Sequence, residues 1–398
     1  MIVKPRIKGF VCITSHPLGC LASVKHQADI AKANPSHGEK APKRVLIIGS
    51  STGYGLSSRI VSAFSSGADT LGVYLERPPK EEKPASAGFY NSLAFNKLSD
   101  ELDTRHLDVN GDAFSHDCKL KVVEMAKQLD GPFDLVIYSL ASPRRVDPNT
   151  GETYRACLKP IGLVYKNKTL DTDKREVKQI SIDPANEVEI ANTTKVMGGE
   201  DWKLWTDLLL EENLLAEGCM NIAYSYIGPE VTQPIYRNGT IGRAKEDLEH
   251  TANQISEKMK EQCSGRAYVS VNKAVVTQAS SAIPVVPLYV SLLFKIMRDK
   301  GNHEGCIEQI VRLFNERLYR QQEDIPVDSF GRIRLDDWEM DPEIQKEVIE
   351  AWGKITSENL LETTNFEEYQ EEFLKLFGFG FDGVDYEKDL DLVNPFGS

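Results

Sequence analysis

One segment near the N-terminus restricts the possible folds more than any other. Residues 44–48 (RVLII) form a short apolar run rich in β-branched side chains, which indicates a strand buried on both faces. The glycine-rich residues 49–55 follow directly, and residues 56–64 continue with helical periodicity. A strand, a glycine turn and a helix in direct succession are typical of a phosphate-binding unit in a parallel α/β sheet.

Further strands and helices alternate along the chain. The pattern predicts strands at residues 69–75, 105–109, 133–140, 220–227 and 266–271, and helices at residues 97–102, 115–129, 201–215 and 242–263. This alternation predicts an α/β fold with a Rossmann-like, doubly wound parallel sheet that has helices on both faces.

The alternation is interrupted by two segments. Residues 142–200 are polar and rich in Pro, Lys, Asp and Thr, and we expect an insertion there with one or two small hairpins. Residues 280–398 are mostly helical in pattern. We therefore expect one large Rossmann-like domain over residues 1–398 rather than two independent domains.

Charge and cysteine usage exclude several classes of protein. The chain has 47 basic and 60 acidic residues, a net charge of −13, which argues against nucleic-acid binding. The most apolar later stretch, residues 282–294, is too short to span a bilayer and contains two prolines, so no stable membrane insertion is expected. The seven cysteines show no C-x-x-C spacing, which favours reduced thiols in a cytoplasmic protein and no metal site.

The glycine segment reads GSSTGYG, with glycines at the spacing G-x-x-x-G-x-G. Gly49 permits a tight turn, Gly53 lets the backbone approach a pyrophosphate, and Gly55 lets the helix lie close to the sheet. The free N–H groups at the start of the helix then face the anion. The alternative is a purely structural turn between a strand and a helix.

Glu76 follows the second strand, about 20 residues after the glycine loop, where a carboxylate accepts hydrogen bonds from the adenosine ribose. It would repel the 2′-phosphate of NADPH by roughly 1–4 kcal/mol at ~4 Å, which favours NADH. Arg77 beside it works in the opposite direction, because a guanidinium can pair with that phosphate. An exposed acid without such a role is the alternative.

Two further residue pairs follow predicted strands. Asp112 and Ala113 come after the third strand, and Leu140 and Ala141 after the fourth. Because ligands of open α/β sheets lie across the carboxyl ends of the strands, we expect these pairs near the adenine and the nicotinamide ribose, respectively. Asp112 is equally suited to be the N-cap of the next helix.

Reductases with this type of sheet use a tyrosine that is paired with a lysine. None of the 14 tyrosines has the Tyr-x3-Lys spacing. The Tyr-x6-Lys spacing occurs at Tyr90/Lys97, and Tyr-x8-Lys occurs at Tyr74/Lys83, Tyr165/Lys174 and Tyr236/Lys245. Spacing alone therefore does not identify the pair.

Position in the predicted fold favours Tyr236 and Lys245. Only this pair follows the fifth strand, and Lys245 lies early in the long helix, within reach of a cofactor at the strand ends. Tyr226, near the end of the fifth strand, is a second candidate for contact with the reacting group. A surface aromatic and a solvated lysine are the alternatives.

These residues lie within motifs that resemble one known family nearly from end to end. The motifs are MIVKPRIKGF, GSSTGYGL, YSLASPRR, KVMGGEDW, YSYIGPE, the Tyr236-x8-Lys245 pair, SVNKAVVTQAS, HEGCIEQ and GFGFDGVDY. The chain resembles the trans-2-enoyl-CoA reductases, also described as FabV-type enoyl-acyl-carrier-protein reductases.

The resemblance implies a short-chain-reductase-like fold with an N-terminal hairpin and substrate-binding insertions. It implies NADH-dependent reduction of the C2=C3 bond of a trans-2-enoyl thioester on coenzyme A or acyl carrier protein, by a monomer. Tyr236 would be the proton donor, Lys245 a cofactor-binding lysine and Tyr226 a substrate contact. The implied cofactor-binding residues are Gly49, Ser50, Ser51, Thr52, Gly53, Tyr54, Leu75, Glu76, Asp112, Ala113, Leu140, Ala141, Lys245, Val275, Val276 and Thr277.

Some alternatives stay open at this point. A carbonyl reductase on the same fold is disfavoured by the missing Tyr-x3-Lys, and a non-catalytic NAD-binding regulator would not need Tyr236 and Lys245. Residues 282–294 are suited either to an apolar groove for an acyl chain or to ordinary core packing. Arg144 and Arg145 are suited either to the phosphates of the acyl carrier or to an exposed surface.

Overall fold

The computed structural model describes residues 1–9, 11–36, 41–320 and 324–397. Its main sheet consists of β3 (Arg44–Ile48), β4 (Asp69–Tyr74), β5 (His106–Asn110), β6 (Phe133–Tyr138), β11 (Leu215–Ser225), β12 (Arg266–Val271) and β13 (Ile333–Arg334). The strand order is β13-β12-β11-β6-β3-β4-β5, and all neighbours are parallel. The chain runs outward from β3 to β5 and returns to β6 on the other side of β3. This reversal between β3 and β6 is where open α/β sheets bind ligands.

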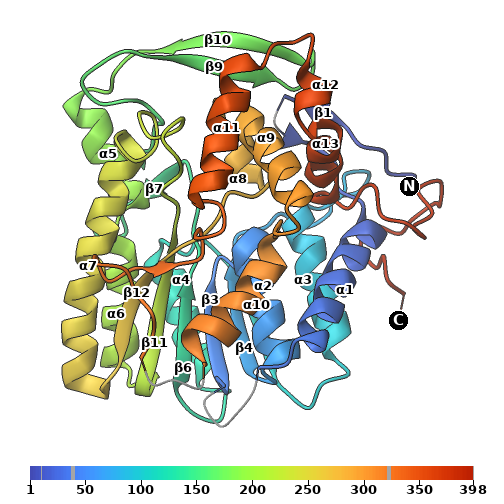
Figure 1. Cartoon of the computed structure of the whole chain (residues 1–398). Helices are drawn as coiled ribbons and strands as arrows, with labels where there is room; N and C mark the ends of the chain where they lie inside the picture. The colour runs from blue at the N-terminus through green and yellow to red at the C-terminus, as the bar shows by residue number, and fades with distance from the viewer. Residues whose placement is uncertain (10, 37–40, 321–323, 398) are drawn as a thin grey trace.

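Helices cover both faces of this sheet (Figure 1). The helices on one face include α1 (Pro17–Ala33), α2 (Gly53–Ile60), η1 (Val61–Ser65), α3 (Ala87–Ser99), α10 (Cys306–Arg312) and η2 (Leu313–Leu318), and those on the other include α4 (His116–Ala126), α6 (Glu200–Glu211) and α7 (Thr240–Cys263). The predicted doubly wound parallel fold is confirmed.

The central strand β3 explains the two-sided arrangement. Val45 and Ile47 pack in the apolar cluster with α2, whereas Leu46 and Ile48 pack in the cluster with α4 and α6. All four side chains are fully buried. Burying such a side chain stabilises the fold by about 1.5–3 kcal/mol, so the RVLII run is fixed at the centre of the sheet.

A third apolar cluster lies outside the two helical layers. It includes residues of α9 (Val286–Asp299), α11 (Pro342–Lys354), α12 (Leu360–Thr363), α13 (Phe366–Lys375), β9 (Tyr165–Asp171) and β2 (Val11–Cys12). The antiparallel hairpin of β9 and β10 (Glu176–Ile182) extends across the top of these helices in Figure 1. Most of residues 282–294 belong to this core, so the core-packing alternative is confirmed for them.

The polar insertion contains the hairpins that the sequence predicts, and one helix that it does not. Besides β9 and β10, it holds the antiparallel pair β7 (Arg144–Val146) and β8 (Thr153–Arg155) and the helix α5 (Glu187–Met197). The N-terminal hairpin implied by the family resemblance is formed by β1 (Ile7–Lys8) and β2.

Several sequence predictions are wrong in detail. The helix predicted at residues 97–102 is α3, which begins ten positions earlier because Asn91 and Ser92 are buried and hide its apolar pattern. Helix α1 was not predicted, since small residues such as Gly19 pack directly on backbone and weaken the periodicity. Strand β11 begins at Leu215 rather than at residue 220, and β13 is too short to be recognised.

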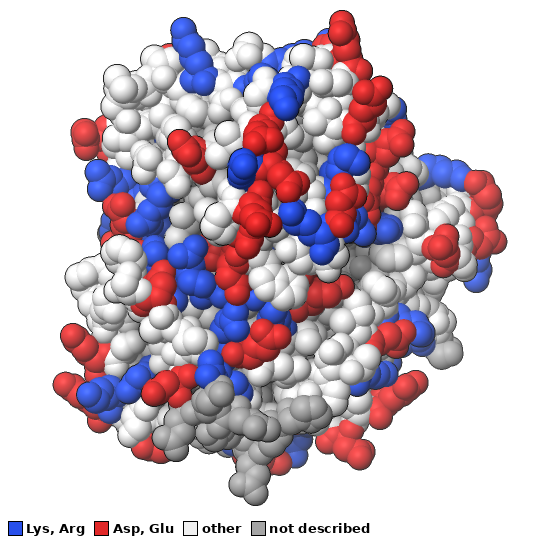
Figure 2. Space-filling view, in the orientation of Figure 1, with Lys and Arg blue, Asp and Glu red and all other residues white. Residues whose placement is uncertain are grey.

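The surface of the described residues carries both positively and negatively charged side chains. On the face seen in Figure 2, Lys and Arg side chains lie among Asp and Glu side chains. None of the described helices is both long and apolar enough to cross a membrane.

A buried ion pair ties α4 to α6 below the ends of the strands. Lys119 Nζ donates to Asp201 Oδ1 (2.7 Å) and to the carbonyl of Ala113 (2.8 Å). Tyr138 Oη donates to the second Asp201 oxygen (3.0 Å). The pair therefore holds the loop after β5, which carries one of the expected cofactor segments.

Replacing Asp201 with alanine would leave the Lys119 ammonium buried without its anion. We expect the free energy of unfolding to fall by about 3–5 kcal/mol, measured by urea denaturation. Asp130→Ala is the matched control, because the Asp130–Arg105 pair is exposed and should contribute less than about 1 kcal/mol. Equal losses in the two variants would contradict this account of the loop.

Candidate active site

The glycine loop between β3 and α2 depends on direct backbone contacts. Gly49 has a φ of +94°, and a Cβ there would lie 2.2 Å from the carbonyl oxygen of Ser139. A Cβ on Gly55 would lie 1.8 Å from the carbonyl oxygen of Gly49. Gly53 has a φ of +53°, a conformation that favours glycine. The three glycines therefore bring the start of α2 tightly against the end of β3, as the sequence predicts.

The start of α2 is free to bind an anion. The N-cap residue Thr52 makes no side-chain hydrogen bond to the helix, so the first N–H groups keep their donors. Thr52 and Gly53 line a cavity of about 800 Å³, and so do Val275, Val276 and Thr277. The fold thus brings together two predicted cofactor segments that are far apart in the sequence.

Glu76 is held in place after β4. Ser51 Oγ donates to Glu76 Oε1 (2.7 Å), and the Asn110 side chain bonds the Glu76 backbone N–H and carbonyl, both at 2.9 Å. Gly88 leaves room for the carboxylate, since a Cβ there would lie 2.0 Å from Glu76 Oε1. The preceding Leu75 is 69% exposed. These contacts connect the carboxylate to the glycine loop.

The other two predicted pairs also follow strand ends. Asp112 does not cap α4: its carboxylate accepts the N–H of Phe114 (3.0 Å), and Ser115 is the N-cap. The N-cap alternative for Asp112 is therefore wrong. Leu140 follows β6 beside Gly49, with a methyl carbon 3.3 Å from where a Gly49 Cβ would be.

Tyr226 and Tyr236 come together after β11. Their rings meet edge to face, with centroids 5.0 Å apart and an interplanar angle of 79°. The carbonyl of Tyr236 accepts the N–H of Gly242 in the first turn of α7 (2.8 Å). A Cβ on Gly242 would lie 1.8 Å from the carbonyl oxygen of Arg237, so this glycine lets the tyrosine turn pack against the helix.

Lys245 lies on α7, and its Nζ donates to the carbonyl of Tyr224 (3.3 Å). Burial lowers the pKa of Lys245 to about 8, against the opposing charge of Glu249. Burial raises the pKa of Tyr236 to about 12. Burial is the cause of this rise, so the Tyr236 hydroxyl keeps its proton near neutral pH.

Two of the alternative tyrosines have structural partners. Tyr90 Oη donates to the carbonyl of Leu392 (3.1 Å), and Tyr165 Oη donates to the carbonyl of Val231 (3.0 Å). Tyr74 is buried within β4. These contacts explain the three side chains as parts of the core.

Sequence reasoning missed the carboxylate behind Tyr226. Glu339 is completely buried, and its Oε1 accepts the hydroxyl groups of Tyr226 (3.0 Å) and Tyr289 (2.6 Å). Its Oε2 accepts the N–H of Ala274 (2.7 Å), next to the cavity-lining Val275. Glu339 lies in the acid-rich segment DDWEMD, which gives no sign of burial.

Lys273 was also missed. Its buried Nζ donates to the carbonyls of Ala274 (2.9 Å) and Glu304 (3.3 Å), and burial lowers its pKa to about 8. Its own carbonyl accepts a hydrogen bond from Tyr54 Oη (2.6 Å), which ties the start of α2 to the segment after β12. A lysine soon after a buried strand, at the edge where ligands bind, is a signal that could have identified it.

Arg145 is not available to an acyl carrier. It is buried, and its Nη1 donates to the carbonyl of Lys195 (2.8 Å) and to Glu200 (2.7 Å). Both sequence-based alternatives, a phosphate contact and an exposed surface, are therefore wrong for Arg145. Arg144 is exposed.

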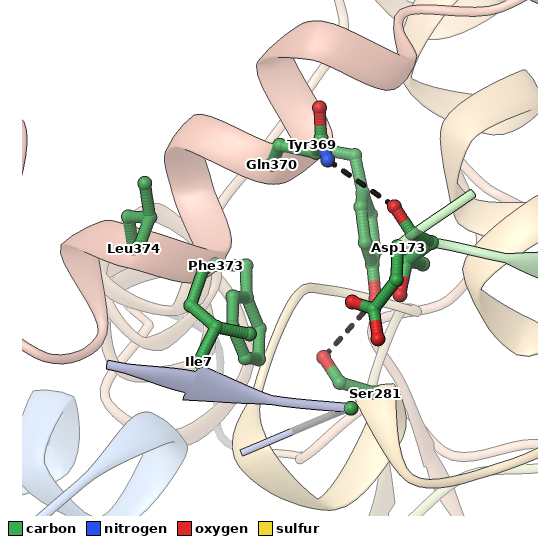
Figure 3. A pocket seen from close by; sticks show the side chains of 9 residues that line it. Ile7, Asp173, Ser281, Tyr369, Gln370, Phe373 and Leu374 are labelled. Carbon is green, nitrogen blue, oxygen red and sulfur yellow. Dashed lines mark hydrogen bonds between the residues drawn. The ribbon is translucent and has the colours of Figure 1, made fainter. Parts of the chain in front are cut away.

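A second, smaller cavity of about 190 Å³ lies at the N-terminal hairpin (Figure 3). It is lined by Ile7, Gly9, Thr172, Asp173, Ser281, Tyr369, Gln370, Phe373 and Leu374. Tyr369 Oη donates to Ser281 Oγ (3.1 Å), and Gln370 Nε2 donates to the carbonyl of Thr172 (3.4 Å). None of the predicted site residues lines it.

The fold and the cavity define a dinucleotide-binding protein with a paired-tyrosine site at the end of β11. Family models match in three parts: residues 83–319 match the trans-2-enoyl-CoA reductase catalytic region, residues 2–81 the NAD(P)H binding domain of trans-2-enoyl-CoA reductase, and residues 327–390 an enoyl reductase FAD binding domain. The chain belongs to the trans-2-enoyl-CoA reductase family.

Relatives and solved structures agree with this assignment. An enoyl-acyl-carrier-protein reductase (NADH) 1 of Vibrio cholerae is 53% identical over 99% of this chain and 98% of its own. A trans-2-enoyl-CoA reductase of Euglena gracilis is 51% identical over 98% of this chain and 72% of its own. The crystal structure of Treponema denticola trans-2-enoyl-CoA reductase in complex with NAD superposes with a TM-score of 0.94 at 49% identity and covers 98% of each chain.

The described residues fit a nicotinamide dinucleotide better than a flavin. The segment that matches the FAD-binding model contains helices α11, α12 and α13. The N-terminus of α11 is capped by the Asp341 carboxylate, and the first turn of α13 carries Glu367 and Glu368. Neither helix start offers an anion site of the kind at α2, so we assign no step to a flavin.

Gly55→Ala tests the loop geometry. The added methyl group must push α2 away from Gly49, and overpacking of this kind costs about 1–3 kcal/mol. We expect the Kd for NADH, measured by fluorescence titration, to rise about tenfold. Gly353→Ala is the matched control, because a Cβ there meets nothing within 4 Å. An unchanged Kd in the Gly55 variant would contradict the proposed anion site.

Proposed function

We propose that this protein uses NADH to reduce the C2=C3 double bond of trans-2-enoyl thioesters to saturated acyl thioesters, as in the last step of fatty-acid elongation. The observation that carries the proposal is the edge-to-face pair of Tyr226 and Tyr236 in a member of this family. Tyr226 is linked through Glu339 to Ala274, next to the segment that lines the cofactor cavity.

The chemistry requires a hydride, a site for the developing negative charge and a proton. Bound NADH supplies the hydride for C3. Tyr226 or Tyr236 donates a hydrogen bond to the thioester oxygen, where enolate charge develops. Tyr236 then supplies or relays the proton, which its raised pKa retains at neutral pH. Lys245, with a pKa of about 8, offers an ammonium group to the cofactor ribose below that pH.

The residues proposed to bind the cofactor divide by the part of NADH that each contacts. Gly49, Ser50, Ser51, Thr52, Gly53 and Tyr54 surround the pyrophosphate; Leu75 and Glu76 bind the adenosine ribose; Asp112 and Ala113 bind the adenine; and Leu140, Ala141, Val275, Val276 and Thr277 bind the nicotinamide half. The open N-terminus of α2 and the fixed position of the Glu76 carboxylate support this division.

The acyl carrier is either coenzyme A or acyl carrier protein, since relatives with both kinds of name are similar over nearly the whole chain. We also propose that the protein is a monomer, as the family resemblance implies. A cytoplasmic location is supported by the seven free cysteines. We treat residues 1–398 as one reductase domain, with residues 142–200 as an insertion and residues 280–398 as substrate-side elements. The contact of the Met1 amino group with the carbonyl of Leu390 (2.6 Å) supports this single unit.

An assay with crotonyl-CoA distinguishes an enoyl reductase from a carbonyl reductase and from a non-catalytic NAD-binding regulator. We expect the purified protein to consume NADH and to form butyryl-CoA. Binding of NADH without turnover would support a non-catalytic regulator instead. Turnover with ketones alone would support a carbonyl reductase.

Tyr236→Phe removes the proposed proton donor and keeps the ring. We expect kcat with crotonyl-CoA to fall by about 10²- to 10⁴-fold while the Kd for NADH stays within about twofold. Tyr268→Phe is the control, because Tyr268 lies on β12, is partly buried and packs against a different apolar cluster from Tyr226. If Tyr236→Phe retained the wild-type kcat, the assignment of the proton donor would be wrong.

Glu76→Ala removes the charge proposed to select NADH. The repulsion of a 2′-phosphate is worth roughly 1–4 kcal/mol at ~4 Å, so the preference for NADH over NADPH should fall about tenfold or more. The measurement is kcat/KM with each cofactor. Glu101→Ala, at an exposed acid, should leave the preference unchanged. An unchanged preference in the Glu76 variant would exclude Glu76 as the selector.

A further inference from the structure

The Glu339 carboxylate forms hydrogen bonds both to the proposed substrate contact Tyr226 and to the segment that leads to the proposed cofactor residue Val275. Its Oε1 is bonded to the hydroxyl groups of Tyr226 and Tyr289, and its Oε2 to the N–H of Ala274. Gln345 Nε2 also donates to the Glu339 carbonyl (2.6 Å) and so fixes the backbone behind it. One fully buried side chain thus sets the positions of Tyr226 and of the segment leading to Val275.

The number of available protons limits what Tyr226 can do. If Glu339 is ionised, the carboxylate has no proton of its own. The hydroxyl protons of Tyr226 and Tyr289 then both point at Oε1. Tyr226 then presents only lone pairs to a thioester oxygen, which repels the developing enolate. If Glu339 is protonated, it donates to one tyrosine, and one hydroxyl proton becomes free for the substrate.

The charged surroundings of Glu339 come from several elements. Lys273, after β12, lowers the pKa of the carboxyl group, and Asp336, after β13, raises it. Tyr289 on α9 and Tyr226 after β11 are direct partners, and burial has the largest effect and raises the pKa overall. The backbone carbonyl of Glu304 accepts a hydrogen bond from Lys273, whereas the Glu304 carboxylate pairs with Arg312.

We propose that Glu339 is a positioning residue that acts in its protonated form: its carboxyl O–H donates a hydrogen bond to the Tyr226 oxygen, and the Tyr226 hydroxyl then donates a hydrogen bond to the thioester oxygen of the substrate. This inference rests on the proposed function and adds a residue and a charge state to it. The hydrogen bonds reorganise without any net transfer of a proton, so Glu339 is unchanged at the end of the reaction.

Glutamine at this position imitates the neutral acid. In Glu339→Gln the amide nitrogen can donate to Tyr226, and the amide oxygen can accept the N–H of Ala274. Glu339→Met fills the same space without a donor, and Glu339→Ala removes the side chain. We expect kcat with crotonyl-CoA to fall about 10- to 100-fold in the Met and Ala variants and clearly less in the Gln variant. The Met variant keeps the comparison valid if the Ala variant does not fold.

A double-mutant cycle with Tyr226→Phe separates positioning from general stability. If Glu339 acts through Tyr226, Glu339→Met should lower kcat in the wild-type background and have little further effect in the Tyr226→Phe background. Because the Met and Ala variants also release the N–H of Ala274, kcat is measured at saturating NADH and the Kd for NADH is titrated separately for every variant.

Two results would overturn the inference: a Gln variant as impaired as the Met variant, or a Met substitution with the same effect in both backgrounds. The first would show that an ionised acceptor is required, and the second that Glu339 does not act through Tyr226. Absence of turnover in the wild-type protein would instead overturn the proposed function itself, and the inference with it.

Discussion

The site depends on the backbone contact between β3 and α2. Gly49 and Gly55 approach so closely that a single Cβ on either would overlap a carbonyl oxygen. This contact places the open N-terminus of α2 over the point where the strand order reverses, and therefore fixes where a pyrophosphate can bind. The Ser51 hydrogen bond to Glu76 connects the glycine loop to the end of β4.

The substrate side is organised by buried polar groups instead of by close backbone contact. Glu339 and Lys273 are enclosed by the third apolar cluster and bond to the segment after β12. Buried polar groups of this kind are costly unless each one finds partners, so they hold neighbouring side chains in one arrangement. Tyr226 is thereby tied to Ala274, which precedes the residues that line the larger cavity.

The sequence predicts the sheet well because its strands are apolar runs between glycine and proline signals. Strands β3 and β12 have the predicted bounds, and the glycine loop lies where the spacing G-x-x-x-G-x-G indicates. Helices α1 and α3 were missed or misplaced because small and polar residues are buried in them. Glu339 could not be found by local patterns, since its partners come from distant strands and helices and its own segment resembles an acidic surface.

The proposed function requires that a hydride passes from NADH to C3 of an enoyl thioester. The most direct measurement uses NADH that carries deuterium at the transferable position, with crotonyl-CoA as substrate, and locates the label in the product by NMR. We expect butyryl-CoA with one deuterium at C3. A saturated product without deuterium, or label found only at the carbinol carbon of an alcohol, would contradict it.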